Sequence, residues 1–111
     1  MNFDRKNFVE YIKTLETPVF VKLTATWCNP CKQIAPFINE WFKKLDEKNM
    51  PHIEIDIDES IDLFAMLKSK RMVQGVPTIL FYNEENESYI PDDSVSGTDE
   101  NMINNFFNSN I

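Results

Sequence analysis

The sequence predicts an α/β fold in which helices alternate with short strands. Two observations carry this expectation. Apolar residues recur at helical spacing in four segments, and short runs rich in Val, Ile and Phe separate these segments. The predicted order is helix, strand, helix, strand, helix, strand, strand, helix. With 111 residues and an apolar fraction of 42%, the chain suits one domain, 1–111, around one compact core.

The first half of the chain is expected to hold two helices and two strands. A helix from about Asp4 to Glu16, with Asp4 as its N-cap, places its apolar residues on one stripe. Residues 19–23 form a mostly apolar run that is typical of a buried central strand. A long helix follows over 29–48. The strict alternation of residues 52–58 then predicts a strand with isoleucines on one face and acidic residues on the other.

The third helix is expected to reach about residue 70. Either Ser60 or Asp58 supplies its N-cap, because both side chains carry an oxygen that accepts a backbone N–H. The residues expected to pack inward are Ile61, Phe64 and Leu67.

The last third of the chain predicts two strands and a helix. Residues 78–82 read as a strand, and an edge strand is expected near 89–90 or 94–95. Thr98 is the predicted cap of a helix that ends at about Asn108. The residues expected to face inward on this helix are Met102, Ile103, Phe106 and Phe107.

Both cysteines, Cys28 and Cys31, lie three residues apart where an apolar run gives way to a helical pattern. In that position the first turn of a helix brings the two sulfurs together, so that one thiolate attacks and the other resolves. In a reducing compartment, two cysteines are more typical of catalysis or metal binding than of a structural disulfide. The pair predicts a dithiol redox centre.

Charge and motif content exclude several functions. A formal net charge of -7 argues against nucleic-acid binding, which needs clustered Lys and Arg. The polar N-terminus, followed by amphipathic spacing, gives neither a secretory signal nor a membrane span, so a cytoplasmic location is expected. No segment resembles a flavin or nicotinamide site, so no cofactor is expected. Nothing calls for an oligomer, and a monomer is expected.

A metal site is not expected either. Two cysteines and one histidine fall short of the four ligands of a structural zinc site. His52 is expected to face solvent rather than to act as a base. Strand alternation and helix capping account for the acidic residues that follow it, Asp56, Asp58, Glu59 and Asp62.

Several motifs together resemble one family of redox proteins. They are Ala25-Thr26-Trp27-Cys28-Asn29-Pro30-Cys31-Lys32, Ala35-Pro36, Asp58, Gly75-Val76-Pro77-Thr78 and Gly97. In order and spacing they resemble the thioredoxin family over almost the whole chain. The resemblance implies the thioredoxin fold, a central mixed sheet of four to five strands flanked by helices on both faces. The N-terminal strand of many thioredoxins would here be reduced to about Met1 to Phe3.

The resemblance also implies a thiol-disulfide oxidoreductase that reduces protein disulfides, with a role in electron transport and cell redox homeostasis. Cys28 at the helix N-terminus is the expected nucleophile, and Cys31 is expected to resolve a mixed disulfide. The expected partners are disulfide-containing protein substrates and a thioredoxin reductase or an equivalent electron donor. The alternatives are a dithiol oxidase or isomerase, a glutathione-dependent reductase, and a non-catalytic interaction module.

Four residues are expected to bind substrate by the same resemblance. A cis peptide before Pro77 would present the backbone of Val76 to an extended substrate segment, while Pro77 would keep metals from the thiols; an ordinary turn is the alternative. The exposed ring of Trp27 would form part of a flat apolar surface, unless it packs beside the dithiol instead. Gly97 and Gly75, the two glycines of the chain, would be needed for their backbone freedom or small size.

The sequence departs from the family behind the dithiol. Where thioredoxins carry a buried Asp and a partnering Lys, this chain has Lys22 and Glu54. We expect a buried or half-buried ion pair of reversed polarity, because either charge alone would be costly there; the alternative is two unrelated surface charges. The ammonium is expected to lower a thiol pKa and Glu54 to accept a proton from Cys31. Asn29 and Pro30 are also expected to tune the thiols.

Overall fold

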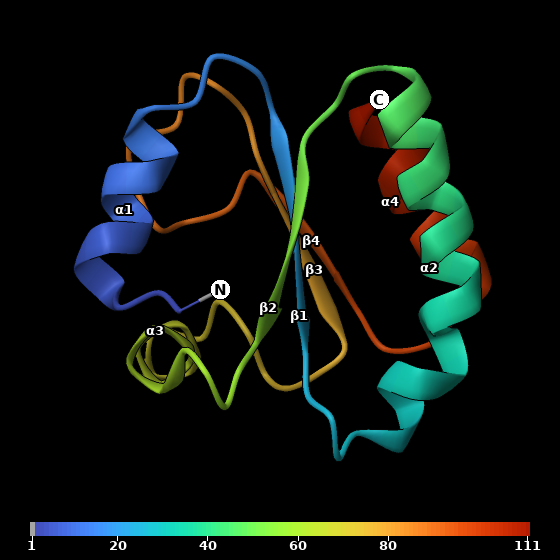
Figure 1. The fold of residues 1–111 in the computed structure, drawn as a ribbon, viewed down its shortest axis with the longest axis horizontal. Coiled ribbons are helices and arrows are strands. Elements are labelled where there is room, and N and C mark those ends of the chain that lie inside the picture. Colours follow the sequence, from blue (N-terminus) through green and yellow to red (C-terminus); the bar gives the residue numbers. More distant parts are fainter. Residues whose placement is uncertain (1) are drawn as a thin grey trace.

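The computed structural model describes residues 2–111 as a mixed sheet covered by helices on both faces (Figure 1). The sheet has four strands in the order β2-β1-β3-β4. Their bounds are β1 Val19–Thr24, β2 His52–Asp56, β3 Thr78–Tyr82 and β4 Asp93–Ser96. Strand β1 runs parallel to β2 and antiparallel to β3, and β3 runs antiparallel to β4. The predicted α/β class and mixed sheet are confirmed. Asn2 and Phe3 belong to no strand, and Met1 lies outside the described residues.

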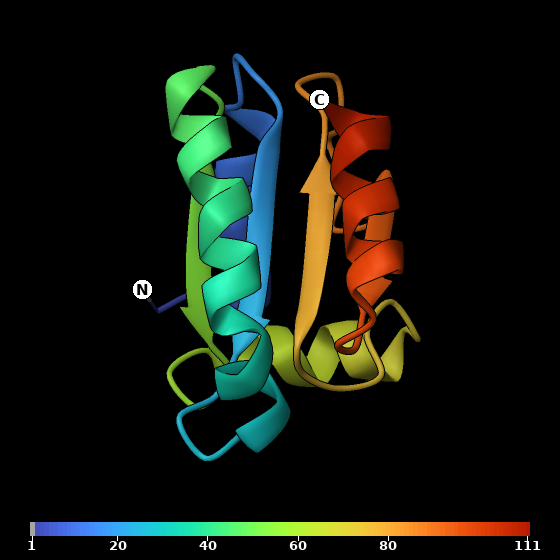
Figure 2. The same ribbon diagram turned by 90° about the vertical axis from the view of Figure 1, so that its right-hand side faces the viewer.

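Two helices cover each face of the sheet. Helices α1 (Arg5–Lys13) and α3 (Ile61–Ser69) lie on one face, and α2 (Asn29–Glu47) and α4 (Glu100–Asn110) lie on the other (Figures 1 and 2). Side chains of β1 alternate between these layers: Val21 packs in the cluster that includes Phe8 of α1, and Phe20 packs in the cluster of α2 and α4. The central strand is therefore buried on both faces, as its apolar run predicts.

Aromatic rings fill the layer between the sheet and helices α2 and α4. The ring of Phe20 lies 4.9 Å from Phe81, 5.8 Å from Phe106 and 5.1 Å from Phe107, measured between centroids. Trp41 of α2 stacks on Phe107 of α4 at 4.9 Å and 11°. These contacts fix α2 against the sheet, and α2 carries both cysteines at its N-terminal end.

Helix α1 begins where the sequence predicts and ends three residues earlier. The Asp4 side chain accepts hydrogen bonds from the backbone N–H groups of Lys6 and Asn7, and the Asn7 side chain completes a capping box. At the other end, Thr14 closes the helix, and its hydroxyl donates to the carbonyl of Tyr11 at 2.7 Å. The predicted end at Glu16 is wrong because Thr14 satisfies the last turn locally.

The inward face of helix α3 differs from the expected one. Ile61 is 69% exposed, whereas Leu63, Met66 and Leu67 are buried. The expectation that Ile61 packs inward is wrong, because the run is apolar on every side and its spacing fits more than one stripe. Ser60 occupies the N-cap position, but the expected capping hydrogen bond between a side-chain oxygen and the first turn is absent. The Ser60 Oγ instead accepts a hydrogen bond from the N–H of Phe3 at 2.8 Å. Tertiary contacts with the N-terminal segment thus orient this helix.

Two details of helix α4 also correct the sequence expectations. Asp99, not Thr98, is the N-cap: its Oδ1 accepts from the N–H groups of Asn101 and Met102 at 2.9 and 3.1 Å. The cap thus lies one residue later than predicted, and Met102 faces solvent. The other predicted inward residues, Ile103, Phe106 and Phe107, are buried.

The edge strand takes the second of its two predicted positions. Residues 93–96 pair with β3, while residues 89–90 belong to no strand. The carbonyl of Tyr89 instead accepts a hydrogen bond from the buried Tyr82 hydroxyl at 2.7 Å. Burial, with a smaller contribution from Asp92, raises the pKa of Tyr82 far above its usual value, so this hydroxyl stays a donor. The long connection before β4 is thereby held against the sheet.

Candidate active site

The two cysteines lie at the junction between β1 and α2. Cys28 is the N-cap of α2 and Cys31 lies in its first turn, and the two form a disulfide with a Cα–Cα distance of 5.2 Å. The backbone N–H of Cys31 donates to Cys28 Sγ at 3.2 Å. Both cysteines are buried, while Asn29 and Pro30 between them are exposed. The helix N-terminus thus presents the Cys31 N–H to the sulfur of Cys28, and an anionic sulfur is stabilised at such a position.

A second loop reaches the dithiol from the start of β3. The Val76–Pro77 peptide is cis, and the carbonyl oxygen of Val76 lies 3.8 Å from Cys28 Sγ. The N–H of Gly97 donates to the carbonyl of Pro77 at 3.0 Å. The fold therefore brings the Val76 carbonyl close to Cys28 and joins Gly97 to Pro77, although these residues lie far from Cys28 in the sequence.

The two glycines differ in what they require. Gly97 has a φ of +91°, a backbone conformation that L side chains rarely adopt, so its backbone freedom is used. At both Gly97 and Gly75 an added Cβ would meet nothing within 4 Å. The expected need for backbone freedom or small size therefore holds at Gly97, through its backbone, and is wrong at Gly75. Gly75 lacks a positive φ as well, and nothing in the structure explains its identity.

Trp27 opens onto solvent beside the dithiol. Its side chain is 62% exposed, and its indole Nε1–H donates to Asp58 Oδ2 at 2.8 Å. Next to the ring lies a hollow of about 590 Å³ between the Trp27 loop, α3 and the Val76 loop. We name this hollow the substrate-side hollow for the role that we propose for it; its apolar lining residues are Trp27, Ile57, Ile61, Phe64, Ala65 and Val76. Sequence reasoning missed Ile61 as a surface residue; the signal available was that α3 carries more apolar residues than one buried face can hold.

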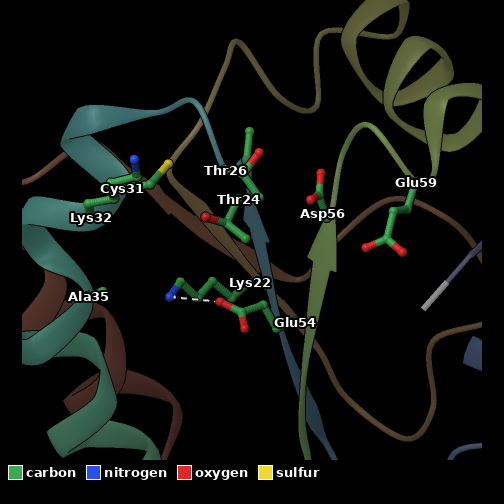
Figure 3. A pocket seen from close by; sticks show the side chains of 10 residues that line it. Lys22, Thr24, Thr26, Cys31, Lys32, Ala35, Glu54, Asp56 and Glu59 are labelled. Carbon is green, nitrogen blue, oxygen red and sulfur yellow. Dashed lines mark ion pairs between the residues drawn. The ribbon is translucent and has the colours of Figure 1, made fainter.

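Lys22 and Glu54 meet on the other side of the dithiol. They are paired in register on the parallel strands β1 and β2, and Lys22 Nζ lies 3.0 Å from Glu54 Oε1 (Figure 3). The Lys22 side chain is 4% exposed and that of Glu54 is 57% exposed. The expected half-buried pair of reversed polarity is present. It lines a hollow of about 400 Å³ that Cys31 and Ala35 of α2 also line, and we call this the charged hollow.

His52 is half-buried, and the prediction that it faces solvent is wrong. Its ring stacks on Phe42 with a centroid distance of 4.2 Å, and its Nε2 lies 2.8 Å from Asp46 Oδ1. This cluster sits at the start of β2, whereas the dithiol follows the end of its parallel neighbour β1. His52 therefore lies at the end of the sheet away from the redox site.

The other acidic residues bond within the protein, Asp56 to a near neighbour and Asp62 to the distant Arg5. Asp56 Oδ1 accepts from the backbone N–H of Asp58 at 2.9 Å, and Asp62 forms an ion pair with Arg5 at 2.9 Å. Across residues 2–111, no three or more His, Cys, Asp and Glu side chains gather as a metal site would require. In the same part of the chain, none of the helices combines the length and apolarity needed to cross a membrane.

A disulfide between Cys28 and Cys31 at a helix N-terminus of an α/β fold is typical of the class of thiol-disulfide oxidoreductases. The thioredoxin family model matches residues 1–109, and the chain belongs to the thioredoxin family.

Individual relatives agree with this assignment. A thioredoxin of Aspergillus fumigatus is 36% identical over 81 residues, which cover 73% of this chain and 70% of the relative. A thioredoxin of Rickettsia bellii is 28% identical over 110 residues, covering 99% and 97%. Among solved structures, Plasmodium falciparum thioredoxin superimposes with a TM-score of 0.72 at 25% identity, covering 99% of this chain and 98% of the other.

Proposed function

We propose that this protein reduces disulfide bonds in other proteins through a dithiol–disulfide cycle of Cys28 and Cys31. The observation that carries the proposal is the position of Cys28 Sγ. It accepts an N–H at the start of α2, lies 3.8 Å from the Val76 carbonyl, and sits where Trp27 and Val76 border an open apolar hollow. A nucleophilic sulfur and a surface for a protein segment thus adjoin.

The cycle begins from the reduced dithiol. The Cys28 thiolate, favoured by the N–H groups and dipole of α2, attacks one sulfur of the substrate disulfide, and the other sulfur leaves as a thiolate that takes a proton from water. The product is a mixed disulfide between Cys28 and the substrate. Cys31 then attacks Cys28 Sγ and displaces the second substrate sulfur. Two electrons pass to the substrate, and the cysteine pair is left oxidised, as in the structure.

Substrate binding is assigned to the residues around Cys28. The backbone of Val76, placed by Pro77 and by the Gly97 hydrogen bond, is positioned to pair with an extended segment next to the substrate disulfide. Trp27 and Ile61 offer apolar contact to the side chains of that segment. The occupant of the substrate-side hollow is therefore the chain that flanks the disulfide under attack.

Regeneration requires an electron donor from outside the chain. A thioredoxin reductase or an equivalent dithiol donor would attack the Cys28–Cys31 disulfide by the same exchange chemistry. Such a cycle operates in a reducing compartment, and we place the protein in the cytoplasm for this reason.

The test combines a substrate assay with two serine variants. The reduced protein is mixed with insulin, and loss of the insulin disulfides is followed. Cys31→Ser should accumulate a mixed disulfide visible on a non-reducing gel, whereas Cys28→Ser should form none, and both should lose turnover. If the wild type leaves insulin disulfides intact while the doubly substituted protein still binds its partners, the protein is an interaction module.

The direction of electron flow is tested by measuring the reduction potential of the Cys28–Cys31 pair. Equilibration in defined thiol–disulfide buffers gives the oxidised fraction, and we expect a potential more negative than that of the glutathione pool. A potential more positive than the glutathione pool would instead assign disulfide formation or isomerisation.

A further inference from the structure

One buried charge in the molecule has no part in the cycle described above. Within residues 2–111, Lys22 is the only charged residue that is buried. It lies in the central strand β1, where a charged side chain is costly unless it is paired. Glu54 supplies the partner at 3.0 Å. Both residues line the charged hollow together with Cys31, the resolving cysteine of the proposed cycle.

The two ends of this ion pair differ in their contact with water. The Lys22 side chain is 4% exposed and the Glu54 side chain is 57% exposed. Figure 3 shows the Lys22 amino group extended toward α2, the helix that carries Cys31 and Ala35, with the Glu54 carboxylate on the β2 side. The pair is thus oriented with its positive end toward the cysteine helix and its negative end toward solvent.

The other charges that line the hollow are closer to water than Lys22. They are Lys32 of α2, Glu54 and Asp56 of β2, and Glu59 in the connection to α3; all are exposed except Asp56, which is half-buried. Solvent and salt screen exposed charges strongly and buried charges weakly. The buried ammonium therefore acts on Cys31 with less screening than the carboxylates that surround it.

We propose that Lys22, anchored by Glu54, is a positioning residue that stabilises the thiolate of Cys31 and so promotes the resolving step. This inference rests on the proposed function, since it assigns roles within the same cycle. It gives Glu54 the task of holding the ammonium in place, and not that of accepting the Cys31 proton.

The step balances without a further reactant. Cys31 Sγ gives its proton to water in the charged hollow, and its electron pair forms the bond to Cys28 Sγ. The bond between Cys28 and the substrate sulfur breaks, and the substrate leaves as a thiolate that takes a proton from solvent. The Lys22 ammonium lowers the energy of the Cys31 thiolate before the thiolate attacks.

The first experiment titrates Cys31 alone. In a Cys28→Ser background, the ultraviolet absorbance of the thiolate is followed against pH, without any substrate. Adding Lys22→Met should raise the titration midpoint by about one pH unit. Lys32→Met is the matched control, because it removes an exposed ammonium from the same hollow, and it should leave the midpoint in place. An unchanged midpoint in Lys22→Met, in a protein that still unfolds cooperatively, would overturn the proposal.

The Lys22→Met substitution is chosen so that the variant still folds. Met fills the volume of the Lys22 stem, and the Glu54 carboxylate left behind is solvated. If Lys22→Met nevertheless fails to fold, Lys22→Gln is titrated in its place, with the same expected direction.

The second experiment measures the resolving rate in the protein with both cysteines. Release of a chromogenic thiol from a preformed Cys28 mixed disulfide is followed below the Cys31 midpoint. Lys22→Met should slow release about threefold. Raising the Cys31 midpoint by about one pH unit reduces the Cys31 thiolate fraction about tenfold, but the thiolate of a thiol with a higher pKa is a stronger nucleophile, which partly offsets the loss. Glu54→Gln should slow release only if it also raises the Cys31 midpoint. Such a rise would mean that Lys22, without its ion-pair partner, no longer stays in place beside Cys31.

The remaining outcomes are decisive as well. If Glu54→Gln slows release while the Cys31 midpoint is unchanged or lower, Glu54 is the proton acceptor and the proposal fails. The wild-type protein could reduce no protein disulfide while the Cys31 midpoint still differs as expected between Lys22→Met and Lys32→Met. In that case the proposed function fails and the electrostatic role of Lys22 stands.

Discussion

Two hollows of opposite character flank the dithiol. The charged hollow, about 400 Å³, lies on the α2 side and contains the Lys22–Glu54 pair. The substrate-side hollow, about 590 Å³, lies between Trp27 and α3 and is lined by apolar side chains such as Ile61. Cys31 borders the first, and Trp27, which precedes Cys28, borders the second. Each cysteine is thus associated with a different environment.

The two cysteines of one short motif need different surroundings. A resolving thiol needs an environment that favours its anion, which a fixed buried cation supplies. A nucleophile that attacks proteins needs an adjoining surface that holds a polypeptide, which exposed apolar side chains supply. On the proposed function, the α2 side therefore governs thiol ionisation, and the α3 side governs substrate recognition.

The largest effect is expected from a charge placed in the substrate-side hollow. Ile61→Asp should lower kcat/KM toward a protein disulfide about tenfold, because it removes apolar contact worth about 1.5 kcal/mol. The helix should tolerate the change, since an acidic residue suits the first turn of α3. Steady-state kinetics with insulin measure the effect.

Met102→Asp provides the matched control for Ile61→Asp. Met102 is also an exposed apolar residue in the first turn of a helix, but it lies on α4, outside the substrate-side hollow. Its substitution should leave kcat/KM unchanged. Equal losses in the two variants would show that the substrate-side hollow has no special role in recognition.

A smaller effect is expected from releasing the Trp27 ring. Asp58→Ala removes the acceptor that lies 2.8 Å from the indole nitrogen, a hydrogen bond worth about 1 kcal/mol. The resulting loss in kcat/KM toward protein disulfides should be about fivefold. Asp58→Asn keeps an acceptor oxygen and should retain most of the activity. A small disulfide that makes no protein contacts should react equally well with all three proteins, and a parallel loss there would contradict a recognition role.

A change at the rim of the charged hollow should matter little. Glu59 is exposed, so solvent screens its charge. Glu59→Gln should alter the Cys31 titration and the resolving rate by less than about twofold. A large effect from this exposed carboxylate would show that net charge, and not the buried ammonium, controls the thiol.

The smallest effect is expected from the ion pair between Arg5 and Asp62 of α3, the helix that contributes Ile61 to the substrate-side hollow. Hydrogen bonds from Arg5 hold the pKa of Asp62 below its usual 3.8. Because the pKa is lowered in the folded state, the ion pair contributes stability above the unfolded pKa, and this contribution is lost as pH falls through the folded pKa. Thermal unfolding of Arg5→Gln should therefore show a slightly weaker loss of Tm in acid than the wild type. Identical pH dependence in both proteins would mean that the pair leaves stability unaffected.

The parts of the fold that follow from local rules agree with their sequence predictions. The Asp4 N-cap, the alternation of β2 and the apolar runs of β1 and β3 depend on neighbouring residues. These elements begin where they are expected, although β2 ends at Asp56, before the predicted end at Asp58. The faces of helices depend on what packs against them. The predictions that Ile61 and Met102 face inward are therefore wrong, since an apolar residue near a helix N-terminus fits the predicted stripe whether or not another element packs against it.

The α/β order, the Cys28–Cys31 motif at a helix start and the reversed charges at Lys22 and Glu54 follow from spacing and residue type, which are local properties. Three other facts are visible only in the folded molecule: Lys22 is the buried end of the ion pair, the Val76 carbonyl lies near Cys28, and Ile61 lines a hollow beside Trp27. These facts depend on strand register and on loops from distant segments, and long-range packing sets both.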